Sequence, residues 1–182
     1  MQKTEYGGGI FTLTPFLSAD ECANYIRSSE QLGFEEAAIQ TATGQELRKA
    51  VRNNDRIIFD DPELAASVFA RIAPFLPEVF GEWQLIGLNE RFRFYRYTAG
   101  QYFKWHKDGF YARNEQEISQ LSLLLYLNGD YQGGETQFRE DVIKPQAGMA
   151  LAFPHLMMHQ GAPIDAGVKY VLRTDVMYRR LF

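Results

Sequence analysis

The chain is poor in cysteine and contains no long hydrophobic run. Cys22 is the one cysteine among 182 residues, so an intrachain disulfide is excluded and a reducing compartment is favoured. No stretch approaches the roughly 18 continuous apolar residues of a membrane-spanning helix. The first nine residues lack the apolar segment of a signal peptide. We therefore expect a cytoplasmic protein.

The chain also lacks a strong charge of either sign. Its formal net charge of −4 provides no general attraction to nucleic acid, so we expect no nucleic-acid partner. A local basic group suits either a solvated strand face or an anion-binding surface; it comprises Arg91, Arg93, Arg96, Lys104 and Lys107. Aromatic residues are abundant, with 14 Phe and 10 Tyr, and they suit a β-rich core or a deep pocket. The length favours one domain, spanning residues 1–182.

Two helices are expected in the first 82 residues. Ser18 and Glu21 have the spacing of a capping box, which predicts a helix that ends near Gly33. Asp61 followed by Pro62 predicts the start of a second helix, because proline is favoured at the first helical position. The polar segment 34–56 between them is expected to be irregular, either a surface loop or one wall of a substrate entrance.

From Trp83 onward the sequence changes to short β-prone stretches separated by Gly, Asn or Pro. The strands expected there are 85–97, 102–108, 120–127, 135–138, 150–153 and 170–178, and one further strand is expected near the start of the chain, at 10–16. Strands at this spacing, with no helical pattern between them, are typical of a sandwich or jelly roll. We therefore expect a mainly β protein, with helical support over about 1–82 packed on one sheet of a β core over about 83–182.

One strand-like stretch carries a histidine and a carboxylate two residues apart, His106 and Asp108. Alternate side chains of a strand point to one face, so these two are expected to converge, with Trp105 packed in the core on the other face. The two remaining histidines of the chain, His155 and His159, follow about fifty residues later. Two imidazoles and one carboxylate are the ligand set of non-haem Fe(II) oxygenases.

Several segments, in order, resemble prolyl 4-hydroxylase-like Fe(II)/2-oxoglutarate dioxygenases. Tyr97–Asp108 (YTAGQYFKWHKD) is similar to the family's first metal-binding segment. Residues 123–128 (LLLYLN) and 133–138 (GGETQF) are similar to its central strands, and 145–153 and 159–170 to its last segments. Together these motifs are specific, although each alone would be weak. The resemblance covers about half of the chain.

The resemblance implies a double-stranded β-helix and an Fe(II) bound by His106, Asp108 and His159. His155 competes for the third ligand position, but His159 stands at the family's distance from a basic residue of the last strand, here Lys169. His155 is then expected to be a loop residue near the pocket mouth. The implied cofactors are Fe(II), 2-oxoglutarate as co-substrate and O2, with ascorbate as a further candidate.

The far carboxylate of 2-oxoglutarate needs a buried cationic partner, because an unpaired charge in such a pocket is costly. By family position this partner is Lys169, assisted by the Tyr126 hydroxyl, with Thr136 and Tyr97 as neighbours. Arg173 lies four residues after Lys169 and has the same strand parity, so it is an alternative partner or a substrate contact.

The function implied by the resemblance is hydroxylation of a prolyl or similar side chain in a peptide or protein, or of a small molecule. Succinate and CO2 would be the co-products. One alternative is a non-catalytic metal-binding jelly-roll module that serves as a sensor or binding domain. Another is a nucleic-acid demethylase of the same superfamily, since Arg173 and Arg179 have the spacing seen in that group; the acidic net charge argues against it.

Overall fold

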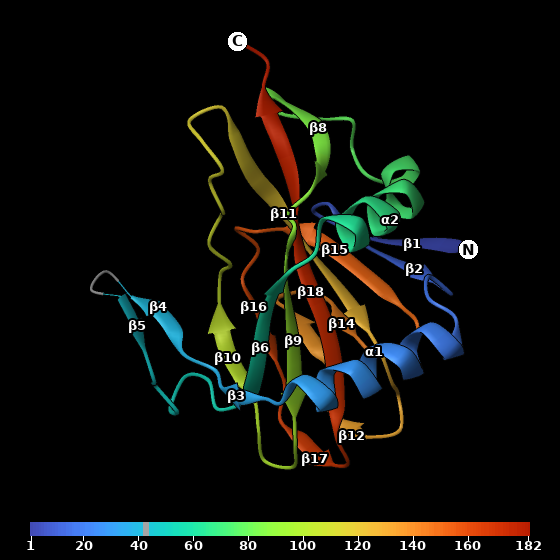
Figure 1. Cartoon of the computed structure of the whole chain (residues 1–182), viewed down its shortest axis with the longest axis vertical. Coiled ribbons are helices and arrows are strands. Elements are labelled where there is room, and N and C mark those ends of the chain that lie inside the picture. The colour runs from blue at the N-terminus through green and yellow to red at the C-terminus, as the bar shows by residue number, and fades with distance from the viewer. Residues whose placement is uncertain (42–43) are drawn as a thin grey trace.

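The computed structural model describes residues 1–41 and 44–182. In this part of the chain ten strands form the main sheet, and all its pairings are antiparallel (Figure 1). Along the sheet the order is β1 (Gln2–Gly7), β2 (Ile10–Thr14), β15 (Ala150–Pro154), β11 (Glu117–Tyr126), β18 (Lys169–Arg180), β9 (Arg91–Tyr97), β6 (Asp55–Asp60) and β3 (Glu35–Glu36), with β8 (Trp83–Leu88) on β18 and β7 (Val79–Phe80) on β8.

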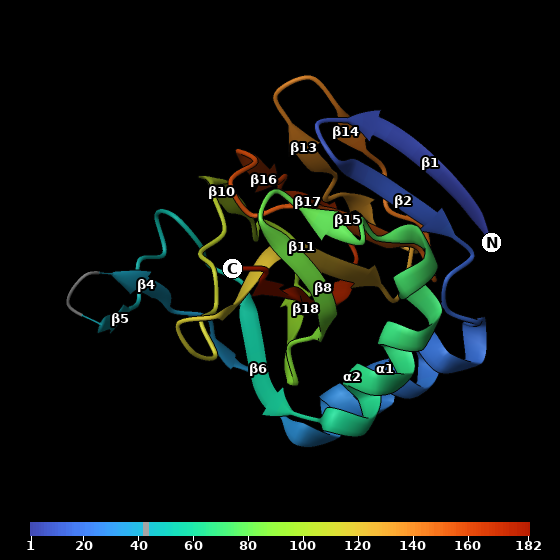
Figure 2. The same ribbon diagram turned by 90° about the horizontal axis from the view of Figure 1, so that it is seen from above.

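A smaller sheet faces the main one. It contains β10 (Phe103–His106), β16 (His159–Gly161), β13 (Thr136–Phe138) and β14 (Val142–Ile143), in that order. Two further strand pairs are β12 (Gln132–Gly133) with β17 (Ile164–Ala166) and β4 (Ile39–Thr41) with β5 (Gly44–Glu46). The β4–β5 hairpin projects from the body in both views (Figures 1 and 2). Two facing antiparallel sheets are the expected jelly-roll architecture.

Both predicted helices are present, α1 (Ala19–Leu32) and α2 (Pro62–Ile72), and a short 3-10 helix (Ala73–Phe75) follows α2. Ser18 and Glu21 form the capping box at the start of α1, and the Asp61 side chain caps α2. The helices cover the face of the main sheet that lies away from the smaller sheet (Figure 2). None of the described helices is long and apolar enough to cross a membrane.

Strand alternation divides the core into two clusters, one on each face of the main sheet. In β9, Phe92 and Phe94 pack on the helix side, whereas Tyr95 and Tyr97 face the smaller sheet. The same alternation in β11 and β18 sends leucines toward the helices. Ser122, Tyr126, Lys169 and Arg173 have the opposite parity, so polar side chains enter the space between the sheets.

Three sequence expectations need correction. The predicted strand 85–97 is interrupted at Asn89, whose backbone N–H donates to the Asp175 carbonyl at 2.8 Å and whose carbonyl accepts the Thr174 hydroxyl at 2.7 Å. The predicted strand 102–108 ends at His106, so Asp108 lies beyond it. Trp105 is 46% exposed and does not pack in the core, because it lies on the face of the smaller sheet that is turned away from the main sheet.

Segment 34–56 is more regular than its composition indicates. It contains β3, the strands β4 and β5, and the first residues of β6. These short strands carry mainly polar residues, so they lack the apolar alternation that marks a half-buried strand. Residues 42–43 of this segment lie outside the described part of the chain. The single-domain boundary, residues 1–182, stays a prediction.

Candidate metal centre and active site

His106 and His159 face each other across two paired strands. β10 and β16 run antiparallel, and their register places His106 opposite His159. The ring centroids are 4.2 Å apart. Phe103 stacks on the His106 ring at 3.5 Å, and Phe153 contacts His159 edge-on at 4.6 Å. The smaller sheet thus brings together two imidazoles from distant parts of the chain and restricts both rings.

Both imidazoles present the same nitrogen to the space between them. His106 Nδ1 lies 2.7 Å from the Lys104 carbonyl oxygen, and His159 Nδ1 lies 2.9 Å from that of Met157. A carbonyl oxygen only accepts, so each Nδ1 carries the hydrogen and each Nε2 keeps its lone pair. Metal-binding histidines are commonly oriented in this way.

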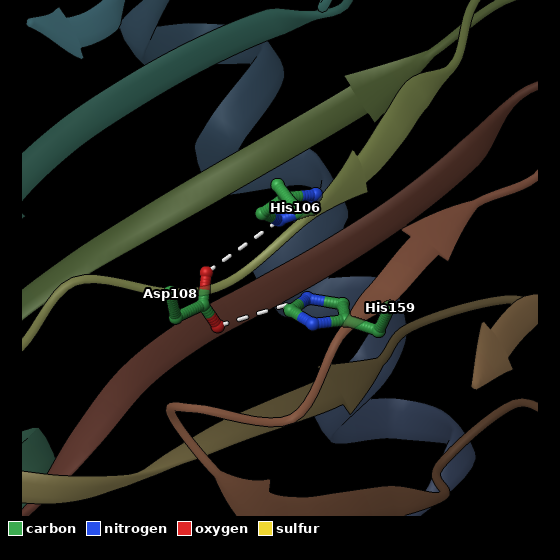
Figure 3. A group of neighbouring side chains, drawn as sticks. All are labelled: His106, Asp108 and His159. Carbon is green, nitrogen blue, oxygen red and sulfur yellow. Dashed lines mark ion pairs between the residues drawn. The ribbon is translucent and has the colours of Figure 1, made fainter. Parts of the chain in front are cut away.

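Asp108 supplies a carboxylate to the same point. Its backbone N–H donates to the His155 carbonyl at 3.0 Å, which fixes the chain just beyond β10. Its Oδ1 lies 3.6 Å from His106 Nε2 and its Oδ2 lies 3.8 Å from His159 Nε2 (Figure 3). One donor atom from each residue lies within 4.8 Å of the others, which makes this a candidate metal-binding group among the described residues.

The ionisation states suit metal binding. Burial alone would raise the pKa of Asp108, but the charge of Arg173 and the contacts with His106 and His159 outweigh it and hold that pKa well below its usual range. Burial lowers the pKa of His159 to about 4, against the attraction of Asp108. At neutral pH the group therefore offers an anionic carboxylate and a neutral imidazole, the forms that bind metals.

A buried chain of hydrogen bonds through Ser122, His155 and Ser119 orients the Asp108 carboxylate. The Ser122 hydroxyl donates to Asp108 Oδ2 at 2.5 Å and lies 2.9 Å from His155 Nδ1, while His155 Nε2 lies 2.7 Å from the Ser119 hydroxyl. His155 lies in the turn after β15, as expected for a loop residue, but it is only 4% exposed, so its expected place at the pocket mouth is wrong. Its backbone N–H donates to the Gln120 carbonyl at 3.0 Å, which keeps it beside β11.

A narrow cavity leads from the three residues to Lys169, and Tyr97 and Thr136 also line it. Lys169 Nζ donates to the Gly134 carbonyl at 2.6 Å and lies 5.6 Å and 5.2 Å from the ring centroids of Tyr97 and Tyr126. Burial lowers the pKa of Lys169 to about 7, against the attraction of Glu135. No carboxylate is in ion-pair contact with Lys169 within the described ranges.

Among the other residues predicted to bind the co-substrate, Tyr97, Thr136 and Arg173 line the narrow cavity, whereas Tyr126 does not. The fully buried Tyr126 hydroxyl is 2.6 Å from Thr136 Oγ1, so it already has a partner. Burial raises the pKa of Tyr97 to about 12. Arg173 also lines the cavity, but its Nη2 lies 3.1 Å from Asp108 Oδ2 and 3.3 Å from Asp175 Oδ1. It is therefore paired at the metal-binding end.

Ser119 and Ser122 were not expected in the site. Ser122 interrupts the leucine-rich β11 at an inward position, and this polar residue was an available signal. Ser119 has the parity of the leucines, but an irregularity of the register between Ser119 and Leu121 lets it also contact His155. Arg52 was also missed; it lies in a segment without an apolar pattern, and its buried position depends on contacts with Tyr95 and Phe103.

Comparisons with known proteins agree with this geometry. Residues 92–174 match the model of the 2OG-Fe(II) oxygenase superfamily. A comparison with curated proteins finds no significant match.

Several solved structures with the same fold are prolyl hydroxylases. A viral collagen prolyl hydroxylase from Paramecium bursaria Chlorella virus-1, in its 2OG complex, has a TM-score of 0.67 at 21% identity, over 95% of this chain and 97% of its own. A Pseudomonas putida prolyl-4-hydroxylase has a TM-score of 0.66 at 20% identity, over 95% of this chain and 93% of its own. A Trichoplax adhaerens prolyl hydroxylase bound to a hypoxia-inducible-factor peptide has a TM-score of 0.72 at 18% identity, over 93% of this chain and 83% of its own. At these identities the likeness shows the fold.

The residues present fit the superfamily's cofactors, Fe(II), 2-oxoglutarate and O2. Two imidazole nitrogens and one carboxylate oxygen form the ligand set expected for Fe(II), and the buried ammonium group of Lys169 suits a dicarboxylate. The matched segment contains all three residues of the candidate metal centre. Residues 92–174 therefore match the 2OG-Fe(II) oxygenase superfamily, a class of oxidoreductases, and the chain has the fold of prolyl hydroxylases.

Proposed function

We propose that this protein is an Fe(II)- and 2-oxoglutarate-dependent hydroxylase whose metal is bound by His106, Asp108 and His159. The convergence of two imidazole Nε2 atoms and one ionised carboxylate carries the proposal. Three protein ligands leave coordination positions open for a co-substrate and O2. When bound, Fe(II) and 2-oxoglutarate would supply the oxidant for C–H hydroxylation, with succinate and CO2 as co-products.

We assign the far carboxylate of 2-oxoglutarate to Lys169 rather than Arg173. Lys169 is buried and has a carbonyl oxygen as its hydrogen-bond partner, so an incoming carboxylate would compensate its charge. Arg173 already contacts two carboxylates, those of Asp108 and Asp175. Its role in the proposal is to keep Asp108 ionised and oriented.

We propose a prolyl or similar side chain as the group that is hydroxylated, in a peptide, a protein or a small molecule. The support is the fold shared with prolyl hydroxylases, one of them bound to a peptide. A second and wider cavity opens onto His106 and Asp108 from the side away from Lys169, so a substrate would have its own approach to the metal.

The two alternative functions, a non-catalytic metal-binding module and a nucleic-acid demethylase, predict different features of the site. A metal-binding module without turnover has no need of a buried lysine at the end of a narrow cavity. For a nucleic-acid demethylase, Arg173 and Arg179 would form a functional pair. However, Arg179 is exposed and binds Glu117 at 2.7 Å, whereas Arg173 lies at the metal centre. Both observations favour the hydroxylase.

We also propose a cytoplasmic location. The thiol of Cys22 is free and buried, as expected for a protein of a reducing compartment. Cell fractionation tests this assignment.

The decisive assay measures succinate formed from 2-oxoglutarate by protein loaded anaerobically with Fe(II) and then exposed to O2. It needs no substrate, because enzymes of this kind turn over slowly without one. His106→Ala, Asp108→Asn and His159→Ala should each abolish metal-dependent succinate. Asp20→Asn is the matched control for Asp108→Asn, because Asp20 is an exposed residue in the first turn of α1.

Two outcomes would contradict the proposal. Stoichiometric metal binding without succinate would favour the non-catalytic module. Activity that survives His159→Ala but is lost in His155→Ala would show that the wrong histidine has been assigned.

A further inference from the structure

The wide cavity beside the metal centre is unusually basic. Its volume is about 680 Å³, and His106 and Asp108 are among the residues that line it. The basic side chains that line it are Arg52, Arg56, Arg91, Arg93, Lys107 and Arg173. Only two carboxylates, those of Asp108 and Asp175, line it with them. The lining thus has an excess of four positive charges on a chain whose formal net charge is −4.

Arg52 is the most unusual member of this group. It is 4% exposed, and its guanidinium lies between two aromatic rings, 4.4 Å from the Tyr95 centroid and 4.5 Å from that of Phe103. Its Nε donates to Asn54 Oδ1 at 2.6 Å, but its buried Nη2 has no hydrogen-bond partner in the described residues. A buried donor without a partner costs free energy, and a bound acceptor would remove that cost.

Arg56 and Arg93 extend the positive charge of Arg52 across the cavity wall. Arg56 donates to the Ala38 carbonyl at 3.3 Å and has no ion pair among the residues that the structure describes. Burial, and then the neighbouring charge of Arg52, lowers the pKa of Arg56. Arg93 and Arg173 both contact the Asp175 carboxylate: Arg93 Nη1 lies 3.3 Å from Oδ2, and Arg173 Nη2 lies 3.3 Å from Oδ1. By contrast, the exposed Arg91 forms two hydrogen bonds with Asp60.

The position of these groups connects them to the reacting centre. The guanidinium of Arg52 covers the Phe103 ring, and that ring stacks on His106 at 3.5 Å. A ligand on Arg52 would therefore lie beside the metal-binding residues. The co-substrate end is separate, because Lys169 and Thr136 line only the narrow cavity.

We propose that Arg52, Arg56 and Arg93, here called the arginine cluster, bind a carboxylate of the substrate and so orient the neighbouring carbon toward the metal. This inference rests on the proposed function and names its substrate class. Guanidinium groups bind carboxylates through paired hydrogen bonds, and burial strengthens such contacts. The carboxylate comes either from a free amino acid or from an acidic residue next to the target in a peptide.

Matched ligands with and without a carboxylate test the inference by equilibrium binding. The protein is loaded anaerobically with Mn(II) and 2-oxoglutarate, and calorimetry compares L-proline with L-prolinamide and acetyl-Asp-Pro-Asp-amide with acetyl-Asn-Pro-Asn-amide. The member with the carboxylate should bind about tenfold more tightly in at least one pair, equivalent to about 1.4 kcal/mol. Preference in the first pair identifies a free amino acid as the source, and preference in the second identifies an acidic peptide.

Three variants show whether the arginine cluster causes the preference. Arg56→Gln and Arg52→Lys should each reduce the preference for the carboxylate about tenfold. Arg56→Gln removes a positive charge, and Arg52→Lys keeps the charge but removes the forked guanidinium donor. Arg91→Gln is the control, since Arg91 lines the same cavity but is paired with Asp60. Arg52 is buried, so Arg56→Gln gives an independent result if Arg52→Lys unfolds.

Equal binding of the members with and without the carboxylate in both pairs would overturn the inference, as would an undiminished preference in Arg56→Gln. The proposed function is tested separately by the succinate assay, and the absence of metal-dependent succinate would contradict it. If succinate forms but the protein does not prefer the ligands with a carboxylate, only the role of the arginine cluster is rejected.

Discussion

His106 and His159 are register partners on β10 and β16, and each donates through Nδ1 to a backbone carbonyl two residues away. The position of the two Nε2 atoms is thus set by sheet pairing and by local backbone hydrogen bonds. A site of this kind is expected to be preorganised, so that binding costs little rearrangement.

Ser122→Ala should weaken Fe(II) binding by about 10- to 100-fold, the usual effect of removing a group that orients a metal ligand. The Ser122 hydroxyl donates to Asp108 Oδ2 and also contacts His155, so its loss frees the carboxylate to rotate. Anaerobic titration with Fe(II) measures the change in dissociation constant.

Ser119→Ala provides the matched comparison. Ser119 contacts His155 and the Tyr111 backbone but does not contact Asp108, so the effect on Fe(II) binding should be smaller than that of Ser122→Ala. Equal effects of the two substitutions would argue against the assigned role of the Ser122 hydroxyl.

Lys169→Gln should raise the KM for 2-oxoglutarate at least tenfold with a smaller change in kcat, because it removes a buried partner for the far carboxylate. The succinate assay at varied 2-oxoglutarate gives both constants. Lys144→Gln, at an exposed position, is the control. If Arg173 were the main partner, Lys169→Gln would leave KM nearly unchanged.

The buried Lys169 should make the protein without 2-oxoglutarate more stable as pH rises from about 7 to about 10.5. Burial lowers the pKa of this lysine from 10.5 to about 7 in the folded chain. Between these values the unfolded chain binds a proton that the folded chain does not, so the free energy of unfolding increases with pH. Below pH 7 the lysine is charged in both states, and the burial cost is present in full.

Urea unfolding at pH 6.5, 8 and 9.5 measures this dependence. Lys169→Met removes the group, so the difference in unfolding free energy between variant and wild type should shrink as pH rises. Comparing the two proteins cancels the contribution of other titrating groups. Parallel pH profiles would show that the lysine does not have a lowered pKa.

Tyr126→Phe should lower the unfolding free energy by about 1 kcal/mol, the usual net value of one intramolecular hydrogen bond. Its hydroxyl is 2.6 Å from Thr136 Oγ1 in a fully buried position. Since that hydroxyl is already paired, the KM for 2-oxoglutarate should change by less than about threefold. A large rise in KM would instead support the sequence-based expectation that Tyr126 assists in binding the carboxylate.

Local signals in the sequence predicted much of the fold. Ser18 with Glu21 and Asp61 with Pro62 marked the starts of both helices, because caps depend on residues within one turn. The ordered motifs predicted the jelly roll and its cofactors. They also predicted that His106, Asp108 and His159 come together.

Features that depend on contacts between distant segments were not predictable. His155 is buried because Ser119 and Ser122 on the paired strand satisfy its ring nitrogens. Asp108 reaches the histidines through the irregular segment after β10, held by the His155 carbonyl, and not through strand alternation. Trp105 is exposed because it lies on the face of the smaller sheet that is turned away from the main sheet, and a local pattern does not encode which face of a sheet is covered.

A crystal structure of the protein with Mn(II) and 2-oxoglutarate, prepared without O2, shows directly whether the three proposed ligands bind the metal and whether Lys169 binds the co-substrate. We predict one anomalous peak at about 2 Å from His106 Nε2, a carboxylate oxygen of Asp108 and His159 Nε2, a usual metal–ligand distance. The far carboxylate of 2-oxoglutarate should contact Lys169 Nζ. A metal bound through His155, or a far carboxylate paired with Arg173 and remote from Lys169, would contradict the account.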